Sequence, residues 1–159
     1  MNKQLKYWLH AAMIAAIYAV LTLAFRPISY GMIQVRISEA LTVLPFFTTA
    51  AIPGLAAGVF IANLMGPYGL TDMVVGTLAT TLAALFTSRV KYKKLAPLPP
   101  VVFNAIMIEL MLYYLFLGTP DQISLWLIIF WVGVGQVIAC YGLGYPLLLL
   151  LEKYKQRIF

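Results

Sequence analysis

The sequence predicts an all-α integral membrane protein, a bundle of six transmembrane helices with both termini in the cytoplasm. Of its 159 residues, 63% are hydrophobic and only 10% are charged, and the mean hydropathy is +0.92. This composition excludes a soluble globular protein. A hydrocarbon core roughly 30 Å thick takes about 20 helical residues, so the length allows about six spans and a single membrane domain over residues 1–159.

The first predicted helix covers residues 8–25 and follows Lys3 and Lys6. It resembles a signal peptide in having basic residues before an apolar run. The run is long, however, and no small-residue cleavage site ends it, so the sequence predicts an uncleaved first span.

The next three helices are separated by proline and glycine. Residues 36–47 form a short second helix, and residues 53–65 form a third that carries Gly54 and Gly58 four positions apart, a spacing that lets another backbone approach closely. The fourth helix begins near Asp72 and continues through a stretch rich in threonine and small residues.

Two helices remain after a basic loop. The fifth is predicted over residues 101–117, and the last over residues 124–151, which is long enough to tilt or bend at its glycines.

Basic residues test this count, because lysine and arginine collect on the cytoplasmic side of membrane proteins. With six spans, only Arg26 and Arg36 lie outside. The inner residues are Lys3, Lys6, Arg89, Lys91, Lys93, Lys94, Lys153, Lys155 and Arg157. If the short second helix did not cross, both later basic clusters would lie outside, so the charges favour crossing.

Arg36 and Glu39 place opposite charges in an apolar chain. At helical spacing they lie on one face, where they can pair with each other or turn together toward a polar ligand. An ion pair that orients a helix end is the structural interpretation. Ionisable residues in membrane segments are also functional candidates, so both interpretations stay open.

The predicted topology sorts the remaining polar residues by depth. Asn63 and Asp72 join Arg36 and Glu39 on the outer side, although for Asp72 a helix N-cap at the interface is favoured. Glu109 lies about ten residues, or roughly 15 Å, into its helix and should face the bundle interior, a cavity or a cation. Asn63, Asn104 and Gln136 fit either interhelical hydrogen bonds or a ligand site.

The first helix carries a stripe of small residues suited to close packing, either inside the bundle or against another protein. Its members recur every four positions and are Ala11, Ala15 and Ala19, with Ala12 and Ala16 one position on.

The sequence gives little support to an enzymatic, metal-binding or nucleic-acid-binding function. We find no phosphate-binding loop, no catalytic triad and no metal-ligand spacing, so we predict no enzyme, no metal and no cofactor. The single Cys140 and the single His10 are interpreted as packing residues. The basic loops follow from membrane topology, so no nucleic-acid partner is expected.

One run of the sequence carries a family resemblance. The resemblance is carried by residues 31–41, which read Gly-Met-Ile-Gln-Val-Arg-Ile-Ser-Glu-Ala-Leu, and then by residues 52–55, Ala62-Asn63 and residues 69–76. The sequence resembles the QueT family of queuosine-precursor transporters over nearly the whole chain. These resemble the substrate-binding (S) components of energy-coupling factor transporters in the prokaryotic cell membrane. The resemblance implies six helices, an outer ligand pocket and a transmembrane T subunit with two ATPases. It also implies that the alanine stripe contacts that T subunit.

The ligand that the resemblance implies is a 7-deazaguanine, such as 7-aminomethyl-7-deazaguanine or queuine. Its guanine-like edge offers adjacent N–H donors to one carboxylate, and its aminomethyl cation suits a second carboxylate. Glu39 and Glu109 are the first candidates, with Asn63 and Asp72 behind them. The flat base should stack on aromatic residues, for which Tyr30, Tyr68 and Trp126 are outer-side candidates.

Other functions stay open. The chain fits an S component for another vitamin, or a non-transporting membrane scaffold whose polar residues only hold the bundle together. A stand-alone secondary carrier has less support, because the sequence shows no paired repeats with broken helices.

Overall fold

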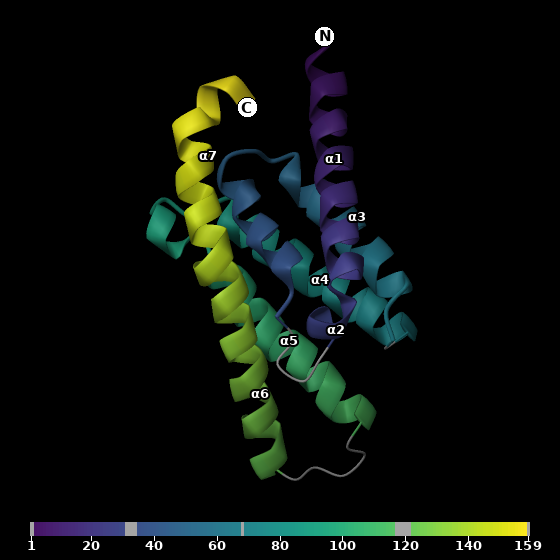
Figure 1. The fold of residues 1–159 in the computed structure, drawn as a ribbon. Coiled ribbons are helices and arrows are strands. Elements are labelled where there is room, and N and C mark those ends of the chain that lie inside the picture. The colour runs from purple at the N-terminus through teal and green to yellow at the C-terminus, as the bar shows by residue number, and fades with distance from the viewer. Residues whose placement is uncertain (1, 31–34, 68, 117–121, 159) are drawn as a thin grey trace.

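The computed structural model describes residues 2–30, 35–67, 69–116 and 122–158, and this part of the chain is helical without strands (Figure 1). Helical segments lie at each predicted place, although the first begins at Lys3 instead of residue 8 and the last continues to Ile158 instead of ending at residue 151. The elements are α1 (Lys3–Ala24), α2 (Arg26–Ser29), η1 (Ile37–Phe46), α3 (Ala51–Leu64), α4 (Gly69–Thr87), η2 (Lys93–Leu95), α5 (Leu98–Phe116), α6 (Gln122–Val137), η3 (Ile138–Gly144) and α7 (Tyr145–Ile158).

The last three elements follow one another without a break and form one long helix (Figure 1). Its middle part, η3, is wound as a π-helix and contains Gly142 and Gly144, so the backbone changes its winding where the glycines lie. Short π segments inside α-helices are frequent at functional sites.

Three helical stretches are long and apolar enough to cross a membrane, namely Lys3–Ala24, Gly69–Thr87 and Ile129–Lys155. Two shorter apolar helices, Ile37–Phe46 and Ala51–Leu64, lie between the first two. α1 begins and α7 ends at the same end of the molecule, as an even number of crossings requires (Figure 1). Six spans and cytoplasmic termini remain predictions.

The short second helix is η1, a 3-10 helix of ten residues that contains Pro45. Such runs are uncommon beyond a few residues. Because a 3-10 helix rises about 2.0 Å per residue, η1 extends about 20 Å, against about 15 Å for an α-helix of the same length. The tighter winding therefore lengthens a segment that is short for a bilayer core of about 30 Å.

α1 and α3 pack at close range through small residues. A Cβ atom added to Gly54 would lie 2.7 Å from the carbonyl oxygen of Ala11, and one added to Gly58 would lie 2.9 Å from that of Ala15. The predicted close approach at the two glycines is thus confirmed, with α1 as the partner.

The alanine stripe divides into two faces as a result. Ala11, Ala15 and Ala19 are buried inside the bundle, so assigning these three to a partner-subunit contact was wrong for this structure. Ala12 and Ala16 are exposed.

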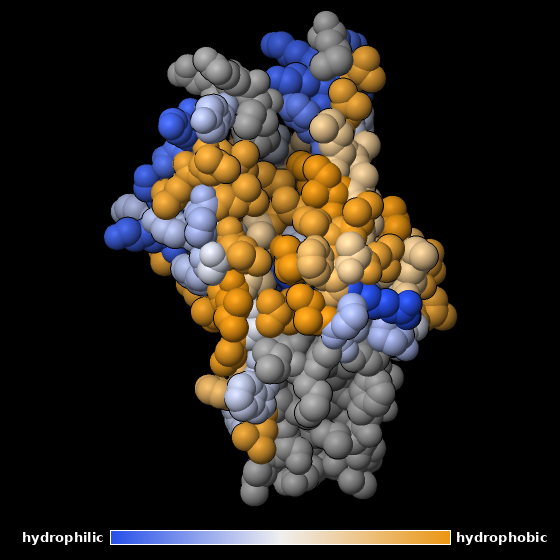
Figure 2. Space-filling view, in the orientation of Figure 1, coloured by the Kyte–Doolittle hydropathy of each residue, from blue (hydrophilic) through white to orange (hydrophobic). Residues whose placement is uncertain are grey.

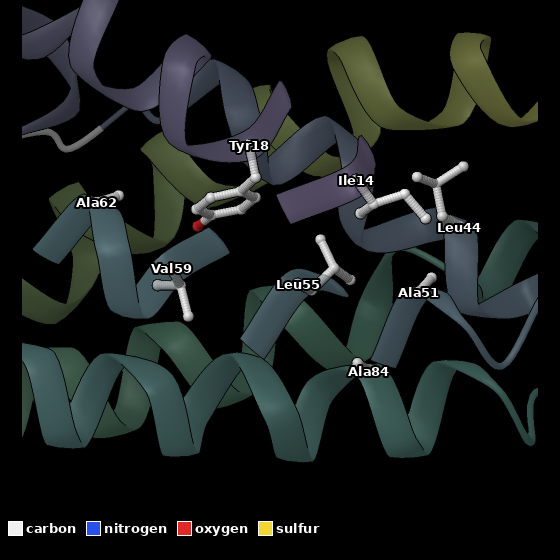
Figure 3. Packing of buried hydrophobic residues seen from close by; sticks show 8 residues of the cluster. All are labelled: Ile14, Tyr18, Leu44, Ala51, Leu55, Val59, Ala62 and Ala84. Atoms are coloured by element: carbon white, nitrogen blue, oxygen red, sulfur yellow. The ribbon is translucent and has the colours of Figure 1, made fainter. Parts of the chain in front are cut away.

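The core joins the first four long elements. Figure 3 shows Ile14 and Tyr18 of α1 packed with Leu55 and Val59 of α3, and the same cluster includes Leu44 of η1. On the face shown in Figure 2, apolar side chains cover most of the described middle part, and hydrophilic residues lie near the end where α1 begins and in smaller groups at the two sides. A lipid environment suits this surface.

Candidate functional site

Buried polar side chains gather around the start of η1 in two groups. The arginine cluster is made of Arg36, Asn63 and Asp72 with Ser29 and Tyr30. The glutamate cluster is made of Glu39 with Tyr18, Thr22, Ser38, Thr42, Asn104, Gln136 and Cys140. All these side chains are at most 9% exposed, and they come from elements far apart in the sequence.

Arg36 is the centre of the first cluster. Its Nη2 lies 3.7 Å from Oδ2 of Asp72, and its Nη1 donates a hydrogen bond to Oδ1 of Asn63 at 3.4 Å. Its Nε donates to the carbonyl oxygen of Ser29 at 3.2 Å, and its guanidinium lies 5.0 Å from the centre of the Tyr30 ring. Four groups from three segments, the end of α2, α3 and α4, therefore surround one arginine, which is 3% exposed.

Asn63 and Tyr30 tie this cluster to the backbone. The Nδ2 of Asn63 donates to the carbonyl oxygen of Asp72 at 3.0 Å, which joins the end of α3 to the start of α4. The hydroxyl of Tyr30 donates to the carbonyl oxygen of Ala62 at 2.8 Å. Both side chains are therefore held in place by hydrogen bonds to the backbone.

Gly76 makes room for Asn63. A Cβ atom added at Gly76 would collide with Nδ2 of Asn63 and lie 3.3 Å from Oδ1 of Asp72. The arginine cluster therefore requires glycine at position 76 of α4, because any larger residue would occupy the space of the Asn63 amide.

Glu39 is the centre of the second cluster. Its Oε1 accepts a hydrogen bond of 2.6 Å from the Tyr18 hydroxyl, and its backbone carbonyl accepts one of 2.6 Å from Thr42. The hydroxyl oxygens of Thr22 and Ser38 lie 2.6 Å apart beside this pair. Glu39 is 1% exposed, so its carboxylate is shielded from bulk water.

Two amides and a thiol complete the glutamate cluster. The Nδ2 of Asn104 donates to Oε1 of Gln136 at 3.1 Å, which joins α5 to α6. The Cys140 sulfur lies 3.8 Å from the same Gln136 oxygen and 3.9 Å from the carbonyl oxygen of Glu39. The π-wound segment η3 thus presents its cysteine to the backbone of η1.

Five buried side-chain atoms of the described residues have no hydrogen-bond partner, and all five belong to the two clusters. They are Oγ of Ser29, Nη2 of Arg36, Oε2 of Glu39, and Oδ1 and Oδ2 of Asp72. A buried polar atom without a partner costs about 1–3 kcal/mol, and more when it is charged. The clusters therefore leave three carboxylate acceptors, one guanidinium donor and one hydroxyl without a partner, as a binding site for a polar small molecule does.

The described residues hold no group of three or more His, Cys, Asp or Glu side chains that could bind a metal ion.

Comparison with known proteins gives the family. The QueT transporter family model matches residues 8–153. The chain belongs to the QueT transporter family. This QueT-family chain is 38% identical over 71 residues to the queuosine precursor transporter QueT of Lactococcus lactis subsp. cremoris (strain MG1363). That alignment covers 43% of this chain and 41% of the relative. No solved structure matches this QueT-family chain.

The structure brings together five of the residues that the sequence predicted for the site. These are Tyr30, Arg36, Glu39, Asn63 and Asp72, all in the two clusters. Their pairing differs from the expectation in two ways, both caused by the fold rather than by local spacing.

Arg36 pairs with Asp72 of another helix, not with its neighbour Glu39. The pairing arises because Arg36 has extended backbone angles just before η1, so it does not share a helical face with Glu39. The N-cap interpretation of Asp72 was wrong. α4 already begins at Gly69, and the Asp72 carboxylate accepts no hydrogen bond from the backbone of the described residues.

The other predicted site residues lie apart from the clusters or outside the described residues. Trp126 of α6 is 66% exposed and is not a member of either cluster. Tyr68 and the side chain of Glu109 lie outside the described residues, although the backbone of Glu109 belongs to α5.

The sequence did not predict Tyr18 and Thr22 as members of the glutamate cluster. Both sit in an apolar helix, and the only signal was their place four residues apart on the face that also carries Ala11 and Ala15. Cys140 packs in the interior as expected, and its contacts with the glutamate cluster were not foreseen.

Proposed function

We propose that this QueT-family chain is the substrate-binding component of an uptake transporter for a queuosine precursor of the 7-deazaguanine class. The two clusters at the start of η1 form its ligand site. The observation that supports this most is the set of five unpartnered polar atoms, concentrated on four buried residues of an otherwise apolar chain.

The chemistry of the unpartnered atoms suits a guanine-like ligand. Oε2 of Glu39 is a free acceptor for N–H donors on the edge of the base. Nη2 of Arg36 is a free donor for the carbonyl oxygen of the base, because the 3.7 Å separation from Asp72 is too long for a hydrogen bond. Asp72 then balances the arginine charge and aims its guanidinium.

The aminomethyl cation of such a ligand needs a different partner. Arg36 would repel it within the arginine cluster. Glu109, five residues after Asn104 on α5, remains the candidate for this role.

Delivery into the cell is proposed to use a T subunit and two ATPases. The exposed Ala12 and Ala16 of α1 give a small-residue surface on which a partner helix can pack closely. The site itself lies on the other side of α1, where Tyr18 and Thr22 face Glu39 and Ser38.

A ligand screen tests the proposal. The purified chain in detergent is heated with 7-aminomethyl-7-deazaguanine, queuine, guanine and common vitamins, and its melting temperature is measured. A ligand at 100 times its dissociation constant stabilises by about 2.7 kcal/mol, which raises the melting temperature by several degrees. Stabilisation by a vitamin alone would make the chain an S component for that vitamin. No stabilisation by any compound would favour the scaffold.

A further inference from the structure

A hollow in the protein lies away from both clusters, at the loop between α4 and α5. It has a volume of about 720 Å³. Residues 91–95, which include η2, line one side, and Glu152 of α7 and Phe46 complete the lining. The Lys93 ammonium donates a hydrogen bond of 2.9 Å to Glu152, so this loop lies beside α7 (Figure 1). We call this hollow the lysine cleft.

The lysine cleft has an excess of positive charge. Lys91, Lys93 and Lys94 line it, against one carboxylate, that of Glu152. Lys93 is the only one of the three with an acidic partner among the described residues. The hydrogen bond to Glu152 raises the pKa of Lys93 above its ordinary value, so this lysine stays charged. Lys91 and Lys94 are exposed and available to an anion.

Apolar side chains lie beside these lysines. Tyr92 is 71% exposed and Leu95 is 45% exposed, although both are large enough to favour burial. Phe46, at the end of η1, lines the same cleft and is half-buried. A soluble anion would use only the lysines, whereas a lipid would use both kinds of surface.

The position of the lysine cleft places it at a membrane surface. The span Gly69–Thr87 ends four residues before Lys91, and Glu152 lies near the end of the span Ile129–Lys155. Lysines and a tyrosine at such a boundary are the side chains that meet phospholipid headgroups.

We propose that the lysine cleft binds the headgroup of an anionic phospholipid, with its phosphate held by Lys91 and Lys94. The acyl chains lie against Tyr92 and Leu95. The bound lipid fixes the loop between α4 and α5 against α7, a contact otherwise made by the exposed Lys93 and Glu152 pair. This site is separate from the ligand site around η1 and does not depend on the identity of the transported compound.

Native mass spectrometry of the chain over residues 1–159 tests the proposal. The detergent-purified protein is titrated with phosphatidylglycerol and with phosphatidylcholine, and the bound lipid is counted. The double variant Lys91→Gln, Lys94→Gln should lose affinity for phosphatidylglycerol by at least about tenfold, because each lysine near an anionic headgroup contributes about 1 kcal/mol, or roughly fivefold. Phosphatidylcholine binding should not change.

The matched control removes the same charge elsewhere. Lys153 and Lys155 lie on the exposed end of α7 and do not line the cleft, so Lys153→Gln with Lys155→Gln should keep phosphatidylglycerol binding. Equal loss in both double variants would mean general electrostatic attraction and would overturn the proposal. Equal affinity for the two lipids in the unchanged protein, or displacement of the lipid by millimolar inorganic phosphate, would overturn it as well. If the double variant does not fold, Lys91→Gln and Lys94→Gln are measured singly, each with an expected loss of about fivefold.

Discussion

Arg36 and Asp72 face each other in the protein interior at 3.7 Å, between Nη2 and Oδ2, without forming a hydrogen bond. Both are buried, and the arginine is held by Ser29, Asn63 and Tyr30. At this separation the two charges compensate each other, but Nη2 of Arg36 and both carboxylate oxygens of Asp72 still lack a hydrogen-bond partner. A ligand that contributes a carbonyl oxygen to Arg36 could bind without displacing Asp72.

Asp72→Asn tests this ion pair. The substitution leaves the Arg36 charge buried without its counter-charge, and breaking a buried pair in this way costs on the order of 3 kcal/mol. The melting temperature in detergent should therefore fall by several degrees. The double variant Arg36→Met, Asp72→Leu should recover most of this loss, because apolar replacement of a buried ion pair is often neutral. An unchanged melting temperature in Asp72→Asn would show that the pair contributes nothing.

Gly76→Ala tests the room made for Asn63. The added methyl group collides with the Asn63 amide, so the cluster must shift, and overpacking of this kind costs about 1–3 kcal/mol. Ligand affinity, measured by isothermal titration, should fall with it. Gly133→Ala is the matched control, because nothing lies within 4 Å of a Cβ added there. Equal behaviour of the two variants would remove the special role of Gly76.

The sequence predicts the helices well because apolar runs and their proline and glycine breakers are local features. It does not predict the winding of η1, since the same apolar pattern fits hydrogen bonds to the third or the fourth residue. The partner of Arg36 could not be predicted either. Asp72 is 36 residues away in the sequence, and only the packing of α4 beside the start of η1 brings it close.

The alanine stripe shows the same limit. Two overlapping four-residue spacings start at Ala11 and Ala12, and each defines a different face of α1. Which face turns inward depends on Gly54 and Gly58 of α3, so the first helix alone does not decide it.

Topology is tested by cysteine labelling. With Cys140 replaced, single cysteines at Lys93 and Lys155 should resist a membrane-impermeant thiol reagent in intact cells, because basic residues collect on the cytoplasmic side. A cysteine at Gly31, which lies outside the described residues, should react. Labelling at Lys93 from outside would contradict six spans.

Leucine substitutions at Ala15 and at Ala12 distinguish the roles of the two faces of α1. Ala15→Leu pushes against the backbone contact with Gly58, so it should lower the melting temperature and ligand binding together. Ala12 is exposed, so Ala12→Leu should preserve folding and ligand binding. If a T subunit docks on this face, Ala12→Leu should still abolish uptake, because leucine blocks close helix approach. Normal uptake by Ala12→Leu would place the partner contact elsewhere.

Ligands of different charge distinguish the proposed roles of Glu39 and Glu109. Glu39→Gln keeps the shape of the side chain but replaces one acceptor oxygen by an amide donor. A guanine-like edge then meets donor against donor, and the mismatch should lower affinity for every 7-deazaguanine by at least about tenfold. Tyr18→Phe is the milder companion, because it removes only the 2.6 Å hydrogen bond to Oε1 and leaves Oε2 in place.

Glu109→Gln should instead weaken only ligands that carry the aminomethyl cation, because a neutral 7-deazaguanine does not need its charge. Isothermal titration of the three variants with one cationic and one neutral 7-deazaguanine makes the comparison. If Glu39→Gln binds both compounds normally, Glu39 is a structural partner of Tyr18 and does not contact the ligand. If Glu109→Gln weakens both compounds equally, its role is to hold the bundle together, and the cation must be recognised by another group.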